Sequence, residues 1–146
     1  MRKPTLRLAA MALALFTSWA ARADNFVFVR NARNSTARLS RADVRAIYTG
    51  KQKQWGDGKL VQVVLGQEGS PGLGWLTGTI FGVGEVALIT KIKQEVFKGE
   101  MRRPISCEGD EDCIAKVKAN EGGVAVVSSE AALALPSGVV VLPVSN

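Results

Sequence analysis

A short turn around Ser70 is the part of this sequence whose residue types and spacing are best suited to chemistry. Ser70 and Pro71 form a pair typical of a helix N-cap and first helical residue, and glycines stand at Gly69 and Gly72. Because the first amides of a helix lack an intrahelical acceptor, we expect Gly72 and Leu73 to donate outward. These amides, the Ser70 hydroxyl and the positive end of the helix dipole predict a binding site for a phosphate-like anion, with Gly69 as a further donor.

The same turn also has a purely structural interpretation. In it, Ser70 caps its own helix, and Glu68 supplies the only negative charge of the turn. Every helix needs a cap, so the spacing alone leaves both interpretations open. Asn31 and Ser128 stand at other predicted strand-to-helix junctions, and we expect them to be second contacts for the same ligand.

Cys107 and Cys113, the two cysteines of the chain, are separated by five residues that include four acids. In an exported chain this spacing predicts a disulfide that closes a small acidic loop. A redox pair is an alternative, but the C-x-x-C spacing is absent. A calcium site at residues 108–112 is another, although these acids lack the regular alternation of a calcium-binding loop.

The chain contains no histidine, which removes the commonest general base and the commonest neutral metal ligand. A Ser-Lys hydrolase with Ser70, Ser128 or Ser129 as nucleophile is the enzymatic alternative, but neither an S-x-x-K nor a G-x-S-x-G pattern is present. We therefore expect a binding protein and not an enzyme, without a metal or other cofactor.

The N-terminal segment has the pattern of a secretory signal peptide. Basic residues precede an apolar run at residues 8–19, and A-R-A at 21–23 matches a cleavage motif. We expect residues 1–23 to be removed after Ala23, leaving one domain at residues 24–146 in the periplasm or outside the cell. No later segment reaches the roughly 20 apolar residues that span a bilayer.

Removal of that segment lowers the formal net charge from +6 to +2, because four basic residues leave with it and all acids stay. The high isoelectric point of the whole chain is therefore weak support for a nucleic-acid partner, and we expect none. An asymmetry remains, since eight basic residues between positions 30 and 59 face only two acids. A basic half attracts anions, although a solvated face is the alternative interpretation.

Hydrophobic periodicity and capping signals predict alternating strands and helices. Ser40 and Asp43 form a capping box, after which Val44, Ile47 and Tyr48 share a helical face. The predicted strands are at residues 26–29, 60–65, 122–127 and 138–142, and the predicted helices at 40–50, from 71 onward, 85–97, 110–119 and 128–135. This order predicts a single compact α/β domain, with helices flanking a mixed, mainly parallel sheet.

Several sequence blocks together resemble the phosphate ABC transporter substrate-binding proteins, of the periplasmic binding protein type II class. The clearest block is LSRADVRAIYTGK followed by WGDG and a valine-rich strand, and weaker blocks are EGS, VFKG and AKVKANEGGVA. These blocks occupy residues 39–51, 55–58, 61–64, 68–70, 96–99 and 115–125. The resemblance implies a periplasmic-binding-protein-like fold, binding and release of an oxyanion such as phosphate, and an ABC permease or a sensor protein as partner.

The chain departs from this family where the ligand is held. Gln67 stands where the family has an arginine, and Pro71-Gly72 stands where it has Gly-Thr. A bidentate arginine selects tetrahedral oxyanions, so its loss is expected to weaken phosphate binding. The alternative function is a degenerate member that binds no small ligand. Such a protein would act as a partner-binding or sensory module through its basic N-terminal half, on a protein, a surface polymer or anionic lipid.

Overall fold

The computed structural model describes residues 25–146, so the predicted signal peptide at residues 1–23 lies outside the described part of the chain. In chain order the described elements are β1 (Phe26–Asn31), β2 (Leu39–Ser40), α2 (Arg41–Tyr48), β3 (Gln62–Gly66), α3 (Pro71–Trp75), the π-helix η1 (Leu76–Phe81), α4 (Glu85–Phe97), β4 (Ile105–Cys107), α5 (Gly109–Ala119), β5 (Gly123–Ser128), the 3₁₀-helix η2 (Ala131–Ala134), β6 (Val139–Leu142) and β7 (Val144–Ser145).

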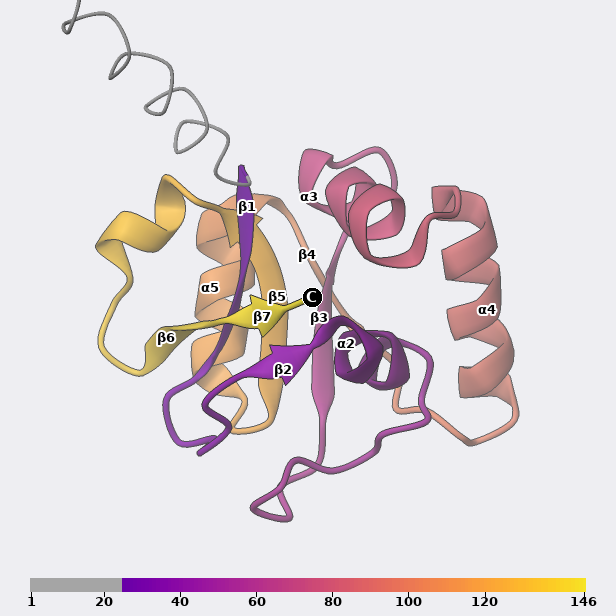
Figure 1. Ribbon diagram of the computed structural model, residues 1–146, viewed down its shortest axis with the longest axis horizontal. Coiled ribbons are helices and arrows are strands. Elements are labelled where there is room, and N and C mark those ends of the chain that lie inside the picture. The colour runs from indigo at the N-terminus through magenta and orange to yellow at the C-terminus, as the bar shows by residue number, and fades with distance from the viewer. Residues whose placement is uncertain (1–24) are drawn as a thin grey trace, which may run out of the picture.

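Five strands form the central sheet in the order β4-β3-β5-β1-β6 (Figure 1). β3 is parallel to β4 and to β5, whereas β1 is antiparallel to β5 and β6. The sheet is therefore mixed and mainly parallel, which confirms the predicted fold class. Because β3, β4 and β5 run in the same direction, their carboxyl ends lie at the same end of the sheet, where open α/β folds bind ligands.

Helices cover both faces of this sheet, and the strands divide their side chains between them. Val29 and Val127 point toward α5 and pack there with Val117. Phe28 and Val124 point to the opposite face. There they join the cluster formed with α2, α3, η1 and α4. Successive strand residues point to opposite faces, so the apolar strands supply the cores of a three-layer domain.

The predicted capping box at the start of α2 is confirmed. The Ser40 hydroxyl accepts the Asp43 N–H at 3.1 Å, and the Asp43 carboxylate accepts the Ser40 N–H at 3.0 Å. The helix then buries the side chains of Val44, Ile47 and Tyr48, as the shared face predicts. This start fixes α2 against the sheet, and its last residue, Tyr48, reaches the region beyond β3.

α3 continues directly into the π-helix η1, which ends at Gly82 with a φ of +64°. Two arginines of α2 hold this end: the Arg41 guanidinium donates to the Thr79 carbonyl at 3.1 Å, and that of Arg45 to the Ile80 carbonyl at 2.8 Å. Free carbonyls at a helix C-terminus are stabilised by such cations. These contacts join α2 to η1, and because η1 continues α3 without a break they also restrain α3.

The predicted boundaries agree with the structure to within about two residues except near residue 130, and the short strands β2, β4 and β7 were not predicted. The helix predicted at 85–97 is α4 with the same bounds, and the helix predicted at 110–119 is α5 with one more residue. The helix predicted at 128–135 is wrong, because only the four-residue η2 forms. Ser128 still belongs to β5, and Pro136 follows closely, so there is room for one short turn.

Within residues 25–146, no single helix is both long enough and apolar enough to cross a membrane. The segments Pro71–Phe81 and Glu85–Phe97 meet that criterion only as a pair, and they are bent by 85° relative to each other.

Candidate functional site

The loop between β3 and α3 lies at the carboxyl end of β3. Gly69 has a φ of +82°, in the left-handed region that glycine adopts without strain. The Ser70 N–H donates to the Gln67 carbonyl at 3.0 Å, and α3 begins at the next residue. Gly72 then lies against β5, where an added Cβ atom would be 3.6 Å from Val126 Cγ1. The N-terminus of α3 therefore stands beside both β3 and β5.

The amides of Gly72 and Leu73 have no hydrogen-bond acceptor among the described residues. The first backbone bond of α3 runs from the Gly74 N–H to the Ser70 carbonyl at 3.1 Å, which leaves these two N–H groups outside the helical ladder. Leu73 also anchors the turn, since its side chain is buried in the core. Both amides are therefore unpaired within the described part of the fold, as the first turn of a helix requires.

The Ser70 side chain does not cap α3, although Ser70 occupies the N-cap position. Its Oγ atom is buried and has no hydrogen-bond partner among the described residues. Gly66 makes room for it, since a Cβ atom there would come within 2.8 Å of Ser70 Oγ. The purely structural interpretation of this turn, in which Ser70 caps its own helix, is therefore wrong. Within residues 25–146 the fold leaves this buried hydroxyl unpaired.

Tyr48 adds a second hydroxyl to this region. The sequence predicted this residue only as part of a buried helical face. Its side chain is 1% exposed, and its hydroxyl also lacks a hydrogen-bond partner among the described residues. Burial raises the pKa of this hydroxyl, so it stays protonated and can donate. A tyrosine at an otherwise apolar helical position was the one signal in the sequence that could have indicated it.

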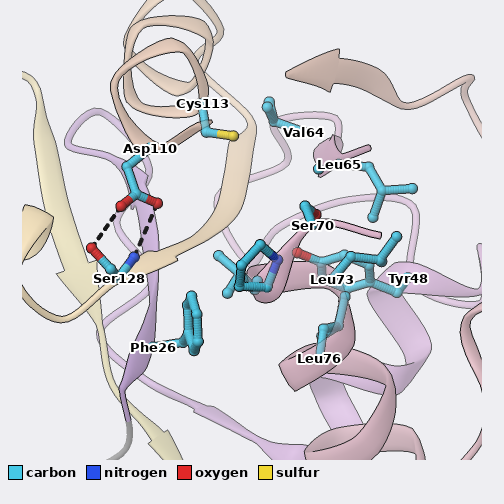
Figure 2. A pocket seen from close by; sticks show the side chains of 14 residues that line it. Phe26, Tyr48, Val64, Leu65, Ser70, Leu73, Leu76, Asp110, Cys113 and Ser128 are labelled. Carbon is cyan, nitrogen blue, oxygen red and sulfur yellow. Dashed lines mark hydrogen bonds between the residues drawn. The ribbon is translucent and has the colours of Figure 1, made fainter. Parts of the chain in front are cut away.

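The turn and Tyr48 line a cavity of about 260 Å³ at the carboxyl ends of β3 and β5. Figure 2 shows Ser70, Leu73 and Tyr48 on one side of it and Phe26, Asp110 and Ser128 on the other. The lining residues are Phe26, Tyr48, Val64, Leu65, Gly66, Ser70, Pro71, Gly72, Leu73, Leu76, Asp110, Cys113, Val126 and Ser128. No cation is among them, so the donors of this cavity are neutral N–H and O–H groups.

Ser128, which the sequence offered as a second ligand contact, lines the cavity, but its polar atoms are already engaged. Its N–H donates to Asp110 Oδ1 at 3.1 Å and its hydroxyl donates to Asp110 Oδ2 at 2.6 Å (Figure 2). The same hydroxyl accepts the Ala131 N–H at 3.1 Å. Asp110 lies in the first turn of α5, where the helix dipole stabilises a carboxylate. The functional group that reaches the cavity here is therefore the carboxylate of Asp110, which sequence analysis did not select.

Two other predicted ligand residues do not share this cavity. The Gly69 N–H donates to Glu85 Oε1 at 3.3 Å, so the start of α4 occupies that amide. Asn31 lies at the opposite end of the sheet because β1 is antiparallel to β5. Its side-chain amide donates to the carbonyls of Val117 and Lys118, both at 3.0 Å, and joins β1 to the end of α5. Asn31 has a structural role here.

The predicted disulfide between Cys107 and Cys113 is present. It joins the end of β4 to the second turn of α5 and thereby restrains the loop that carries Asp110. Both cysteines are buried, and Cys113 lines the cavity. The disulfide therefore supports one wall of the candidate site.

Solved structures that resemble this chain include proteins connected with phosphate. A candidate phosphate ABC transporter substrate-binding protein from Clostridium perfringens, solved with bound phosphate, is 17% identical, with a TM-score of 0.62 over 82% of this chain and 44% of that protein. A candidate phosphate-binding protein from Planctomyces limnophilus is 14% identical, with a TM-score of 0.63 over 84% and 42%. PstS from Borrelia burgdorferi is 13% identical, with a TM-score of 0.61 over 84% and 47%.

At 17%, 14% and 13% identity, these similarities show the fold alone: the chain folds like part of each of these proteins. The chain spans less than half the length of each of these structures. No protein-family model and no curated protein sequence matches it. What the fold contributes is a scaffold that places the carboxyl ends of β3 and β5, and the α3 turn between them, around one cavity.

Proposed function

We propose that this protein is an exported solute-binding protein that binds phosphate or a similar oxyanion in the cavity beside α3. The observation that carries this proposal is the convergence of unpaired donors from residues that line a single cavity. They are the N–H groups of Gly72 and Leu73 and the hydroxyls of Ser70 and Tyr48. An oxyanion accepts several hydrogen bonds at once, and the start of α3 adds a favourable dipole.

The Asp110 carboxylate determines which oxyanion suits this cavity best. Its oxygens accept bonds from Ser128, and each retains a further lone pair. A carboxylate repels a fully ionised anion but accepts a hydrogen bond from a protonated one. Phosphate carries such a proton near neutral pH and sulfate does not. We therefore expect phosphate to bind more tightly than sulfate.

The affinity is expected to be modest, because the cavity has no arginine clamp. Gln67 stands at the position where the resemblance places an arginine. Its side chain is exposed and donates to Glu108 Oε1 at 2.9 Å. Neutral donors give weaker hydrogen bonds to an anion than a guanidinium does. Glu68 is exposed and does not line the cavity, so the repulsion expected from it is small.

Transport partners are part of the same proposal. An ABC permease or a sensor protein would recognise the loaded form, and binding and release would involve no covalent change. The chain spans less than half of each similar structure, so the transport partners of those proteins are carried over only as part of this proposal.

The alternative, a module that binds partners through a basic N-terminal half, lacks a supporting observation. The guanidinium groups of Arg41 and Arg45 donate to backbone carbonyls. Arg33, Lys53 and Lys59 form ion pairs with acids from the same domain. Much of the apparent basic excess is therefore used inside the fold, and the anion-binding cavity is the better-supported function.

Isothermal titration calorimetry of the purified protein with phosphate and with sulfate tests this function. Ser70→Ala removes one donor from the cavity, and Ser137→Ala is a matched control at an exposed serine outside it. We expect saturable heat with phosphate, weaker binding of sulfate, a loss of affinity in Ser70→Ala and no change in Ser137→Ala. Absence of heat at millimolar phosphate, or equal behaviour of the two variants, would contradict the proposal.

A further inference from the structure

A second hollow in the surface lies between α4 and the segment that leads into β4. We call it the α4 groove; its volume is about 440 Å³. Its walls are mainly apolar, and most of them come from one side of α4. The lining residues are Leu65, Ile89, Ile92, Lys93, Val96, Phe97, Arg103, Pro104 and Ser106. Of these, only Leu65 also lines the cavity beside α3.

The apolar surface of α4 continues beyond the groove. Phe97 is 92% exposed at its C-terminal end and Val86 is 78% exposed near its N-terminus. They are 11 residues apart, which is about three helical turns, so they lie on one side of the helix over a length of about 16 Å. Large exposed apolar residues that adjoin an apolar groove are typical of an interaction surface.

The charges along the α4 groove are all positive. Lys93 and Arg103 line it, both are exposed, and neither forms an ion pair within residues 25–146. No carboxylate lines the groove. The nearby Glu95 is held by Lys91 at 2.9 Å and by Lys98 at 3.6 Å, and the hydrogen bond from Lys91 lowers its pKa. The groove therefore complements a partner with an apolar face and acidic residues beside it.

A helix suits the α4 groove better than an added β-strand does. β4 is an edge strand of the sheet, and a strand partner would need its free backbone groups. The Lys116 side chain occupies one of them, because its Nζ donates to the Ser106 carbonyl at 2.7 Å. Because this carbonyl already accepts from a side chain of α5, an added strand would lose that backbone hydrogen bond. An amphipathic helix needs no backbone hydrogen bonds and uses apolar anchors spaced three or four residues apart.

We propose that the α4 groove docks an acidic amphipathic helix of a partner protein. The apolar side chains of that helix contact Val96 and Phe97, and its acidic residues pair with Lys93 and Arg103. The exposed Phe97 is the expected centre of the contact, because aromatic residues that become buried contribute most to interface affinity. This site is independent of anion binding.

Selection from a displayed library of helix-forming peptides on the purified protein tests the proposal without a known partner. We use two groove variants: one carries Phe97→Ser, and the other carries both Lys93→Glu and Arg103→Glu. All three residues are exposed, and none forms an ion pair among the described residues. The control, Lys51→Glu with Leu133→Ser, makes the same kinds of change at exposed residues outside the groove. Fluorescence anisotropy of the selected peptides on each protein then gives their affinities, and thermal unfolding checks that each variant is folded.

We expect the selected peptides to carry glutamate or aspartate beside an apolar face. Their binding should weaken by about tenfold or more in both groove variants and stay unchanged in the control. Peptides in which lysine replaces each acid should bind the Lys93→Glu, Arg103→Glu variant better than the original protein. The proposal is overturned if no peptide is enriched, if the enriched peptides are basic, or if they bind all variants equally. Dimerisation that Phe97→Ser abolishes, or groove-dependent binding to phosphatidylglycerol vesicles, would identify a different occupant and overturn it as well.

Discussion

Two serines at the same end of the sheet differ in what surrounds them. Ser128, at the end of β5, donates to Asp110 through both its N–H and its hydroxyl, and the hydroxyl also accepts the Ala131 N–H. Ser70, at the turn after β3, has a buried hydroxyl without a partner among the described residues. Ser128 belongs to a turn whose polar groups satisfy one another, whereas the Ser70 turn leaves its donors free.

The difference indicates where a bound ligand would form the most favourable hydrogen bonds. Buried polar groups are normally hydrogen-bonded, and leaving one unpaired costs about 1–3 kcal/mol. Arg30 Nε and Asn34 Nδ2 are also buried without partners, but neither residue lines the cavity. An isolated unpaired group is therefore weak support for a site. The Ser70 and Tyr48 hydroxyls matter because both belong to residues of one cavity, beside two unpaired amides.

The largest expected effect comes from removing the disulfide that restrains the Asp110 loop. Cys107→Ala with Cys113→Ala should lower the free energy of unfolding by about 2 kcal/mol, because the short loop closed by the bond gains freedom mainly in the unfolded chain. Guanidinium chloride denaturation measures this change. A loss below about 0.5 kcal/mol would mean that the disulfide does not support this wall.

A paired substitution of the two serines sharpens the comparison directly. Ser128→Ala should destabilise the protein by about 1.5 kcal/mol, since it leaves Asp110 and the Ala131 N–H with fewer partners. Ser70→Ala removes an unpaired buried hydroxyl and should leave stability unchanged or raise it by up to about 1 kcal/mol. Thermal and denaturant unfolding of both variants gives the two values. Equal losses would show that Ser70 has a structural partner after all.

Tyr48→Phe separates stability from binding in the same cavity. Removing a buried hydroxyl without a partner should leave stability unchanged or raise it by up to about 1 kcal/mol. Phosphate affinity should fall by about tenfold, which corresponds to one lost hydrogen bond to an anion. Calorimetric titration and denaturant unfolding measure the two effects. Weaker stability with unchanged affinity would place Tyr48 in the core and not in the site.

The smallest expected effect concerns Asp112, in the loop closed by the disulfide, and the loss of stability at low pH. The hydrogen bond from Lys116, together with the Glu108 N–H, lowers the pKa of Asp112. A lowered pKa in the folded state means that the ionised form is stabilised on folding. The contribution is present above the unfolded pKa of about 3.9 and is lost as the pH falls through the folded value. Asp112→Asn should flatten the loss of stability below about pH 4, as unfolding measured from pH 6 to pH 2 would show.

The sequence predicted those features that depend on local signals. The capping box of Ser40 and Asp43, the bounds of α4 and the disulfide follow from spacing over a few residues, and all three are present. The two amide donors of α3 follow from the general lack of acceptors in a first helical turn.

The remaining site features depend on tertiary arrangement, which local spacing does not contain. The antiparallel direction of β1 moves Asn31 to the far end of the sheet. Glu85 lies 16 residues further along the chain than the Gly69 amide it accepts from, and Asp110 of α5 accepts from Ser128. Tyr48 enters the cavity only because α2 packs against η1, the continuation of α3. Each of these outcomes depends on which elements pack together.

The most direct test of the central claim is the response of the Gly72 and Leu73 amides to phosphate. Nuclear magnetic resonance of ¹⁵N-labelled protein follows both N–H groups during a titration. If these amides bind the anion, their proton resonances should move downfield in a saturable way, and the Gly69 amide, already bonded to Glu85, should move much less. If Gly72 and Leu73 do not respond at millimolar phosphate, or if only surface lysines and arginines do, the cavity beside α3 is not an anion site.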